Sequence, residues 1–241
     1  MKCKAGCLIH TPDPKRIPLV TKLFQSVLNL GLLLLLASPV RAEGSWDGQP
    51  YFGLSGMLAE ARQSKVDSAT GNPDPTFIKG AEVATHSGYG VSGYYGWLFD
   101  SNWRAEFELS RRSVPLSEIS GSAGTATLNG HLAMNGFFIN VARDFRGKSF
   151  ATPYLGLGAG VAIHELDLET VNGAPGLPNR TPVTPAFQFL LGVLLEAGED
   201  TDIVMGYRYV NYYAPDYTEF SYDFVDFHNF ELGFRFYPED W

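Results

Sequence analysis

The chain has 241 residues and a formal net charge of −8, and only 18% of its residues are charged. An acidic chain repels phosphate backbones, which argues against nucleic acid as a partner. Both cysteines, Cys3 and Cys7, lie near the amino terminus, so the remainder of the chain must be stable without disulfide bonds.

Residues 1–42 have the organisation of a secretory signal peptide. A basic lead is followed by an apolar run from Val27 to Ala37, and Val40 and Ala42 stand three and one positions before the expected cleavage site. The run is shorter than the roughly 20 residues of a membrane-spanning helix, so an uncleaved membrane anchor is the weaker alternative. The sequence therefore predicts a removed segment, 1–42, and one domain, 43–241.

The predicted domain is more acidic than the whole chain. Residues 1–42 contain six of the 18 Lys and Arg residues and one of the 26 Asp and Glu residues. Residues 43–241 therefore keep 12 basic and 25 acidic side chains, a formal net charge of −13. This balance strengthens the argument against a nucleic-acid partner.

The predicted domain alternates apolar and polar residues with the period of two that is typical of β-strands. In "NWRAEFELS", Trp103, Ala105 and Phe107 share one face, and Arg104 and Glu106 share the other. The same alternation recurs in the stretches that begin at 186, 201 and 227. The pattern predicts strands and gives no stretch of helical period.

A glycine-rich stretch, "PYLGLGAGVA" at 153–162, follows the same period. Gly156, Gly158 and Gly160 share the polar face of a predicted strand, and Leu155 and Leu157 lie on its apolar face. A dinucleotide-binding loop requires G-x-G-x-x-G followed by a helix, and this stretch meets neither condition. Large side chains inside a narrow barrel need small residues opposite them, so we predict that these glycines make space in a barrel lumen.

Eight strands are predicted, and the lengths of their connections alternate. Short connections at 100–102, 143–149 and 198–200 alternate with long ones at about 60–80, 114–125, 169–185 and 214–226. This asymmetry is typical of outer-membrane barrels. The predicted fold is an all-β, closed, eight-stranded, antiparallel, up-and-down transmembrane β-barrel, with a soluble periplasmic β-sandwich as the alternative. The strands are expected at 50–59, 81–99, 103–113, 126–142, 150–168, 186–197, 201–213 and 227–237.

The chain resembles the small eight-stranded outer-membrane barrels, which include the OmpA-like transmembrane domain and the opacity-type surface antigens. "PYLGLGAGVA" at 153–162 is similar to their fifth strand, "FQFLLGVLLEAGEDTDIVMGYRYV" at 187–210 to their sixth and seventh strands, and "ELGFRFYP" at 231–238 to their last strand. The resemblance covers 43–241. It implies a protein of the outer membrane of a Gram-negative bacterium, inserted by the assembly machinery of that membrane, and it says little about function.

Charged residues on the inward face form the clearest candidate site. Buried charges must be paired, so we predict a structural network of ion pairs in the lumen, with a gated ion path as the functional alternative. Eight strands leave no open aqueous channel. The predicted members are Arg104, Glu106, Glu108, Glu196, Arg208, Glu231 and Arg235.

Two histidines have neighbours that suggest chemistry. His164 and Glu165, with Asp167, could ligate a metal, and His86 and Ser87 could belong to a hydrolase that acts on envelope lipids. Adjacent residues of a strand point to opposite faces, which argues against both interpretations. We therefore predict no catalytic residue, no cofactor and no metal site.

The last long loop combines aromatic and acidic residues. Tyrosine-rich loops supply contact area at low entropic cost, so we predict a contact surface for a host or other surface protein. The alternative is a rim that packs on itself and on lipopolysaccharide headgroups. The residues expected there are Tyr212, Tyr213, Asp216, Tyr217, Glu219, Tyr222 and Asp223.

The expected function is structural and interactive. The sequence predicts an integral outer-membrane protein without catalytic activity that exposes four long loops at the cell surface. A narrow ion-conducting pore and a barrel enzyme acting on envelope lipids are the alternatives. Outer-membrane lipid, lipopolysaccharide and the assembly machinery are the other expected partners.

The signal-peptide assignment predicts the amino terminus of the exported protein. Expression of the whole chain in a Gram-negative host should yield a product that begins at Glu43. Mass spectrometry of the intact purified protein checks this. A product that retains the apolar run from Val27 would instead support the membrane-anchor alternative.

Overall fold

The computed structural model describes residues 48–62, 64–69, 80–99, 102–122, 124–175, 181–213, 220–222 and 224–238. These residues belong to one compact unit, Trp46–Trp241. The predicted signal peptide, 1–42, lies outside them. Within these ranges no helix is long and apolar enough to cross a membrane.

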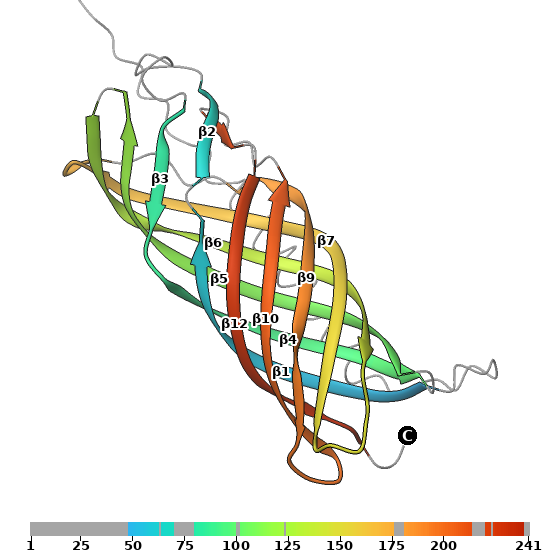
Figure 1. The fold of residues 1–241 in the computed structure, drawn as a ribbon. Coiled ribbons are helices and arrows are strands. Elements are labelled where there is room, and N and C mark those ends of the chain that lie inside the picture. Colours follow the sequence, from blue (N-terminus) through green and yellow to red (C-terminus); the bar gives the residue numbers. More distant parts are fainter. Residues whose placement is uncertain are drawn as a thin grey trace, which may run out of the picture. The chain divides into compact units, whose positions relative to one another are not determined.

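Eight long strands of the described residues close into one ring, as the sequence predicts (Figure 1). Each strand pairs antiparallel with its neighbours along the chain, and the last strand returns to pair with the first. The alternative of two packed sheets is therefore wrong. In chain order the ring consists of β1 (Gly48–Ala61), β4 (Gly88–Phe99), β5 (Trp103–Gly121), β6 (Gly124–Asp144), β7 (Ala151–Val171), β9 (Val183–Glu196), β10 (Thr201–Tyr213) and β12 (Phe224–Phe236).

Four short strands add to the end of the ring where the long connections lie. They are β2 (Ser64–Ala69), β3 (Glu82–Thr85), β8 (Ala174–Pro175) and β11 (Phe220–Tyr222). β3 pairs with the far part of β5, and β2 links β3 to β11. The single strand expected at 81–99 is thus two strands, because residues 86–87 interrupt it.

The expected long loop at 114–125 is wrong. β5 and β6 remain paired to Gly121 and Gly124, so this segment is a β-hairpin that continues the wall of the barrel. Its inward residues Val114 and Leu116 are buried in the apolar part of the interior, which gives the extra strand length a reason to stay paired.

The expected loop at 169–185 also begins later than predicted. β7 runs to Val171 and turns back into β8 at Asn172 and Gly173, which have φ of 50° and 78°. Two successive residues of positive φ are what a two-residue hairpin turn requires, and Asn-Gly is its commonest sequence. The dipeptide itself was the sequence signal for this turn.

The two faces of each strand have inverted polarity relative to a water-soluble protein. On β5, Arg104, Glu106 and Glu108 are buried, whereas Trp103 and Phe107 are 44% and 45% exposed. On β7 and β12 the outward residues Leu157 and Leu232 are 66% and 61% exposed. Apolar side chains therefore form a band around the outside of the barrel, and charged side chains fill part of its inside.

The interior has two layers. Charged and tyrosine side chains occupy the end with the short turns, because they come from the first residues of β5 and β10 and the last residues of β6 and β12. An apolar cluster occupies the other end and includes Val114, Leu132, Phe138, Val210 and Phe227. The apolar cluster lies inside the part of the barrel that extends toward the long connections.

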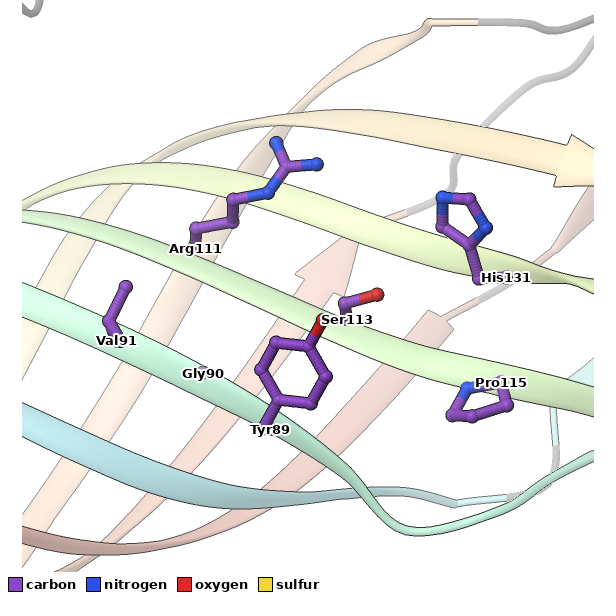
Figure 2. Close-up of a pocket in the computed structure, with 7 residues that line it drawn as sticks. All are labelled: Tyr89, Gly90, Val91, Arg111, Ser113, Pro115 and His131. Carbon is purple, nitrogen blue, oxygen red and sulfur yellow. The ribbon is translucent and has the colours of Figure 1, made fainter.

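The outer wall is hollowed where the apolar band ends on β4, β5 and β6. Tyr89 and Val91 of β4 lie on one side of a groove of about 390 Å³, and Arg111 and His131 lie across it (Figure 2). All of these side chains alternate with buried neighbours on their strands, so the groove faces outward.

The three glycines of β7 are required by close approach from two sides. A Cβ at Gly158 would overlap the side chain of Asn140 and would lie 2.8 Å from the Cγ of Gln188. This glycine therefore makes space for polar groups in the lumen. A Cβ at Gly156 would lie 2.7 Å from the Cβ of Ala142, and one at Gly160 would meet the backbone of β6. At Gly156 the inward side chain of Ala142 and the backbone of β6 both exclude a larger residue, whereas at Gly160 the β6 backbone alone excludes it.

Replacing Gly160 with valine should destabilise the barrel by about 1–3 kcal/mol, because the added carbons overlap the β6 backbone. The midpoint of urea unfolding in lipid vesicles measures the effect. Gly93→Ala is the matched control, since a Cβ there has its nearest neighbour at 3.9 Å. Equal midpoints for Gly160→Val and the wild type would contradict the close approach of β6 and β7.

Candidate functional site

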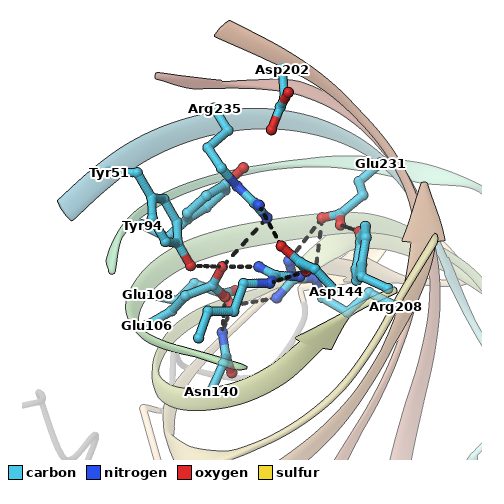
Figure 3. A network of polar contacts seen from close by, with 12 residues as sticks. Tyr51, Tyr94, Glu106, Glu108, Asn140, Asp144, Asp202, Arg208, Glu231 and Arg235 are labelled. Carbon is cyan, nitrogen blue, oxygen red and sulfur yellow. Dashed lines mark hydrogen bonds and ion pairs between the residues drawn. The ribbon is translucent and has the colours of Figure 1, made fainter. Parts of the chain in front are cut away.

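The interior charges form one connected network that crosses the barrel (Figure 3). In the part of the chain that the structure describes, its buried ionic members are four guanidinium groups and five carboxylates. Such groups remain ionised away from water only when they are paired and hydrogen-bonded. They are Arg104, Arg112, Arg208, Arg235, Glu106, Glu108, Asp144, Asp202 and Glu231.

Arg104 begins the network near the short turns. Its Nε donates to Asp144 Oδ1 at 2.8 Å, and its Nη1 is paired with Glu106. Its guanidinium also lies over the ring of Tyr154, 4.6 Å from the centroid. Tyr51 donates to Glu106 Oε1 at 2.8 Å, so the carboxylate is held from two strands.

Arg235 of β12 closes this layer from the opposite wall. Its Nη1 lies 3.4 Å from Asp144 Oδ2 and 3.2 Å from the hydroxyl oxygen of Tyr237. Tyr237 in turn donates to Asp202 Oδ2 at 2.9 Å. The guanidinium lies 4.7 Å from the ring centroid of Tyr51, which combines an ion pair with a cation–π contact.

Arg208 of β10 bridges two carboxylates in the middle of the barrel. Its Nη2 is 2.8 Å from Glu231 Oε2, and its Nη1 is paired with Glu108. Asn140 and Gln188 each donate to Glu108 Oε2 at 2.8 Å. These amide groups stabilise the negative charge of Glu108 by hydrogen bonding, and Gly158 leaves room for their side chains.

Arg112 carries the network toward the apolar cluster. Its Nη1 donates to Ser110 at 2.9 Å and to the Tyr212 hydroxyl at 3.2 Å, and its Nε donates to Asn229 Oδ1 at 3.1 Å. Its Nη2 lies 3.9 Å from Glu108 Oε1. Arg112 is fully buried, so these contacts replace its hydration.

The network leaves little free volume. A space of only about 10 Å³ remains among its central members, close to the volume one water molecule requires. The apolar cluster fills the interior beyond it. A conducting pore would need a continuous aqueous path through the barrel. The described interior contains packed side chains along that path.

Six of the seven residues predicted for the lumen lie in this network, and Glu196 does not. Glu196 has the inward phase of β9, but it is the last residue of that strand and is exposed at the turn to β10. Sequence reasoning also missed Arg112, Asp144 and Asp202. Arg112 continues the alternation of Arg104, Glu106 and Glu108 and could have been found by extending that strand, whereas Asp144 was taken for part of a turn.

One residue predicted for the contact surface of the last long loop lies inside the barrel instead. Tyr212 is fully buried and its ring packs edge-to-face against His164, so its assignment to a surface is wrong. Tyr213 points the other way and is 53% exposed. Tyr222 lies on β11, and the remaining members, Asp216, Tyr217, Glu219 and Asp223, lie outside the described residues.

The structure does not bring the members of either histidine pair together in one site. His164 is buried and its Nε2 is 2.8 Å from the Thr184 hydroxyl, whereas Glu165 faces outward and pairs with Arg111. Ser87 donates to Glu60 at 3.2 Å, and both His86 and Ser87 are exposed. Within the described residues, the hydroxyl of Ser87 thus donates to a carboxylate.

Removing one charge from the network should be costly. Arg208→Met removes the guanidinium that pairs with the buried Glu231 and leaves Glu108 only the more distant Arg112, at 3.9 Å, so it should destabilise the barrel by about 3–5 kcal/mol, measured as the shift in urea unfolding. Arg111→Met breaks an ion pair whose side chains are 47% and 34% exposed, so it should cost less than about 1 kcal/mol. Similar losses for both variants would contradict a buried network.

The comparisons with known proteins agree with this architecture. No family model and no curated protein matches the chain. Among solved structures, Neisserial surface protein A is similar at 16% identity, covering 79% of this chain and 97% of that one with a TM-score of 0.52. The outer membrane protein OprG from Pseudomonas aeruginosa is similar at 14% identity, with the same coverages and TM-score. The chain therefore has the fold of the small eight-stranded outer-membrane β-barrel proteins.

Proposed function

We propose that this protein is an integral outer-membrane barrel with a closed interior, whose role is to present its extended strands and loops at the cell surface. The observation that carries the proposal is the inversion of polarity. Charges are buried inside the ring while large apolar side chains such as Leu54, Leu157 and Phe234 are more than 60% exposed outside it.

The outer band has the composition that a bilayer requires. On β7 the outward residues are apolar from Leu155 to Ile163 and become acidic at Glu165 and Asp167. That apolar stretch spans about 26 Å along the strand at about 3.3 Å per residue, comparable with the roughly 9–11 residues of a tilted transmembrane strand. The closed ring leaves no unpaired strand edge in the band, which lipid would not tolerate.

The short-turn end carries the aromatic residues expected at a membrane interface. The rings of Tyr95 and Trp97 lie 4.7 Å apart, and Trp97 is 6.1 Å from Phe107 on the next strand. Arg143 lies 5.6 Å above the ring of Trp103. With an even number of strands, this end faces the periplasm, and the long connections face the outside.

The part of the barrel beyond the band supports a role in contact. β5 continues from Arg111 to Gly121, which adds about 33 Å of paired strand outside the apolar region. A rigid pedestal of this kind can hold loops away from the membrane. The partners proposed for this end are a host or other surface protein, and lipopolysaccharide around the wall.

A pore and an enzyme are less well supported. The packed network and apolar cluster oppose ion flow through the interior. The hydrolase interpretation pairs Ser87 with the imidazole of His86, and the Ser87 hydroxyl instead donates to the exposed carboxylate of Glu60 on the outer wall. We therefore propose that the protein has no catalytic activity of its own.

Fractionation and conductance test the proposal together. The full chain expressed in a Gram-negative host should appear in the outer-membrane fraction and change mobility on a detergent gel when boiled. The purified barrel should give no discrete current steps in a planar bilayer in which a 16-stranded porin does. A soluble product without a mobility shift would refute the membrane assignment, and steps that Arg208→Met alters would establish the pore.

A further inference from the structure

We propose that the groove on the outer wall of β4, β5 and β6 binds the phosphorylated sugar headgroup of a glycolipid in the outer leaflet. This inference rests on the proposed membrane placement and adds a defined site and ligand class to it. The groove has a volume of about 390 Å³, within the range of sites that hold small ligands.

The height of the groove on the barrel selects a lipid headgroup. Tyr89 pairs across the strands with Leu58, an outward residue that is 66% exposed and belongs to the apolar band. On β5 the outward sequence changes from Phe107 and Leu109 to Arg111 at this level. A molecule in the groove therefore contacts both the apolar band and the first polar side chains beyond it.

The two walls of the groove differ in chemistry (Figure 2). The β4 wall presents the ring of Tyr89, 71% exposed, and the side chain of Val91, 55% exposed. The opposite wall presents the guanidinium of Arg111 and the imidazole of His131, above a floor of Ser113 and Pro115. An amphipathic molecule with an apolar ring face and an anionic group matches this pair of walls.

A hydrogen-bond triangle keeps the groove open. Arg111 Nη1 donates to Asn135 Oδ1 at 2.8 Å, and its Nη2 lies 3.1 Å from Glu165 Oε2. Asn135 donates to the other oxygen of Glu165 at 2.9 Å. The triangle holds the Arg111 side chain across β6, so it does not fold over Ser113, and its fork is positioned before a ligand arrives.

The same triangle sets the direction of approach. Glu165 and Asp167 lie on β7, behind Arg111 and His131 as seen from the groove, and Asp167 is the cross-strand partner of His131. A phosphate would be repelled from the β7 side and attracted from the β4 side. The phosphate is therefore expected between Arg111 and His131, with the sugar ring on Tyr89.

Lipid binding to the purified full barrel tests the site. Phosphatidylcholine nanodiscs would contain graded fractions of lipid A, of dephosphorylated lipid A or of phosphatidylglycerol, and native mass spectrometry would count the lipids retained per barrel. The wild type should retain lipid A selectively. Arg111→Gln combined with His131→Gln should weaken retention about tenfold, as expected for the loss of a charge-assisted hydrogen bond.

Two further variants separate the groove from general electrostatics. Ser113→Trp fills the floor without changing a charge and should weaken retention similarly. Arg143→Gln removes an exposed arginine from the opposite rim and should leave retention unchanged. The boiling shift on a detergent gel confirms that each variant is folded.

Several results would overturn the inference. Equal retention of phosphatidylglycerol would exclude glycolipid selectivity, and equal retention of dephosphorylated lipid A would exclude phosphate recognition. An effect of Arg143→Gln as large as that of the double variant would indicate general attraction to anions. Wild-type retention by Ser113→Trp would place the lipid elsewhere. If the barrel fractionates with the outer membrane and does not conduct, yet fails these lipid tests, the lipid site is refuted and the proposed function stands.

Discussion

The ion pairs inside the barrel are the constraint on which the rest of the structure depends. Arg208 and Arg235 are buried side chains of two different strands, and each contacts a carboxylate on another strand. The network therefore fixes the register of the ring. A slip of one residue would turn either guanidinium onto the apolar band, at a cost of about 2–4 kcal/mol in the middle of a bilayer. The same slip would bury leucine and phenylalanine side chains against charges. The inverted polarity of the barrel therefore depends on the register of its strand pairing.

The two interior layers pack inside different parts of the barrel. The charged layer lies within the part surrounded by the apolar band, where the strands must be held in register against lipid. The apolar cluster lies beyond it and includes Val114, Leu116 and Leu128 from the extended β5 and β6. It gives those strands a core of their own outside the band. The described interior is therefore filled with side chains at both levels.

The outer wall shows how an ordinary surface contact can acquire a role. An exposed ion pair such as that of Arg111 and Glu165 contributes little to stability. Together with Asn135 it nevertheless determines where the Arg111 side chain lies, and so whether the wall beside Tyr89 is filled or hollow. Its importance is thus positional, because it shapes the groove for which a glycolipid headgroup is proposed.

The sequence by itself determined the period of two, the polarity of each face and the short connections at one end of the strands, and these indicate a closed eight-stranded barrel. Each is a local property that a single strand or turn carries. Only the tertiary structure decided that Glu196 is exposed at a strand end, that Tyr212 is inside, and that residues 114–121 stay paired. It also decided that Asp144 joins Arg104 and Arg235. These outcomes depend on strand stagger and on ring closure, which bring together residues as far apart in the chain as Phe52 and Phe236 and which no local pattern specifies.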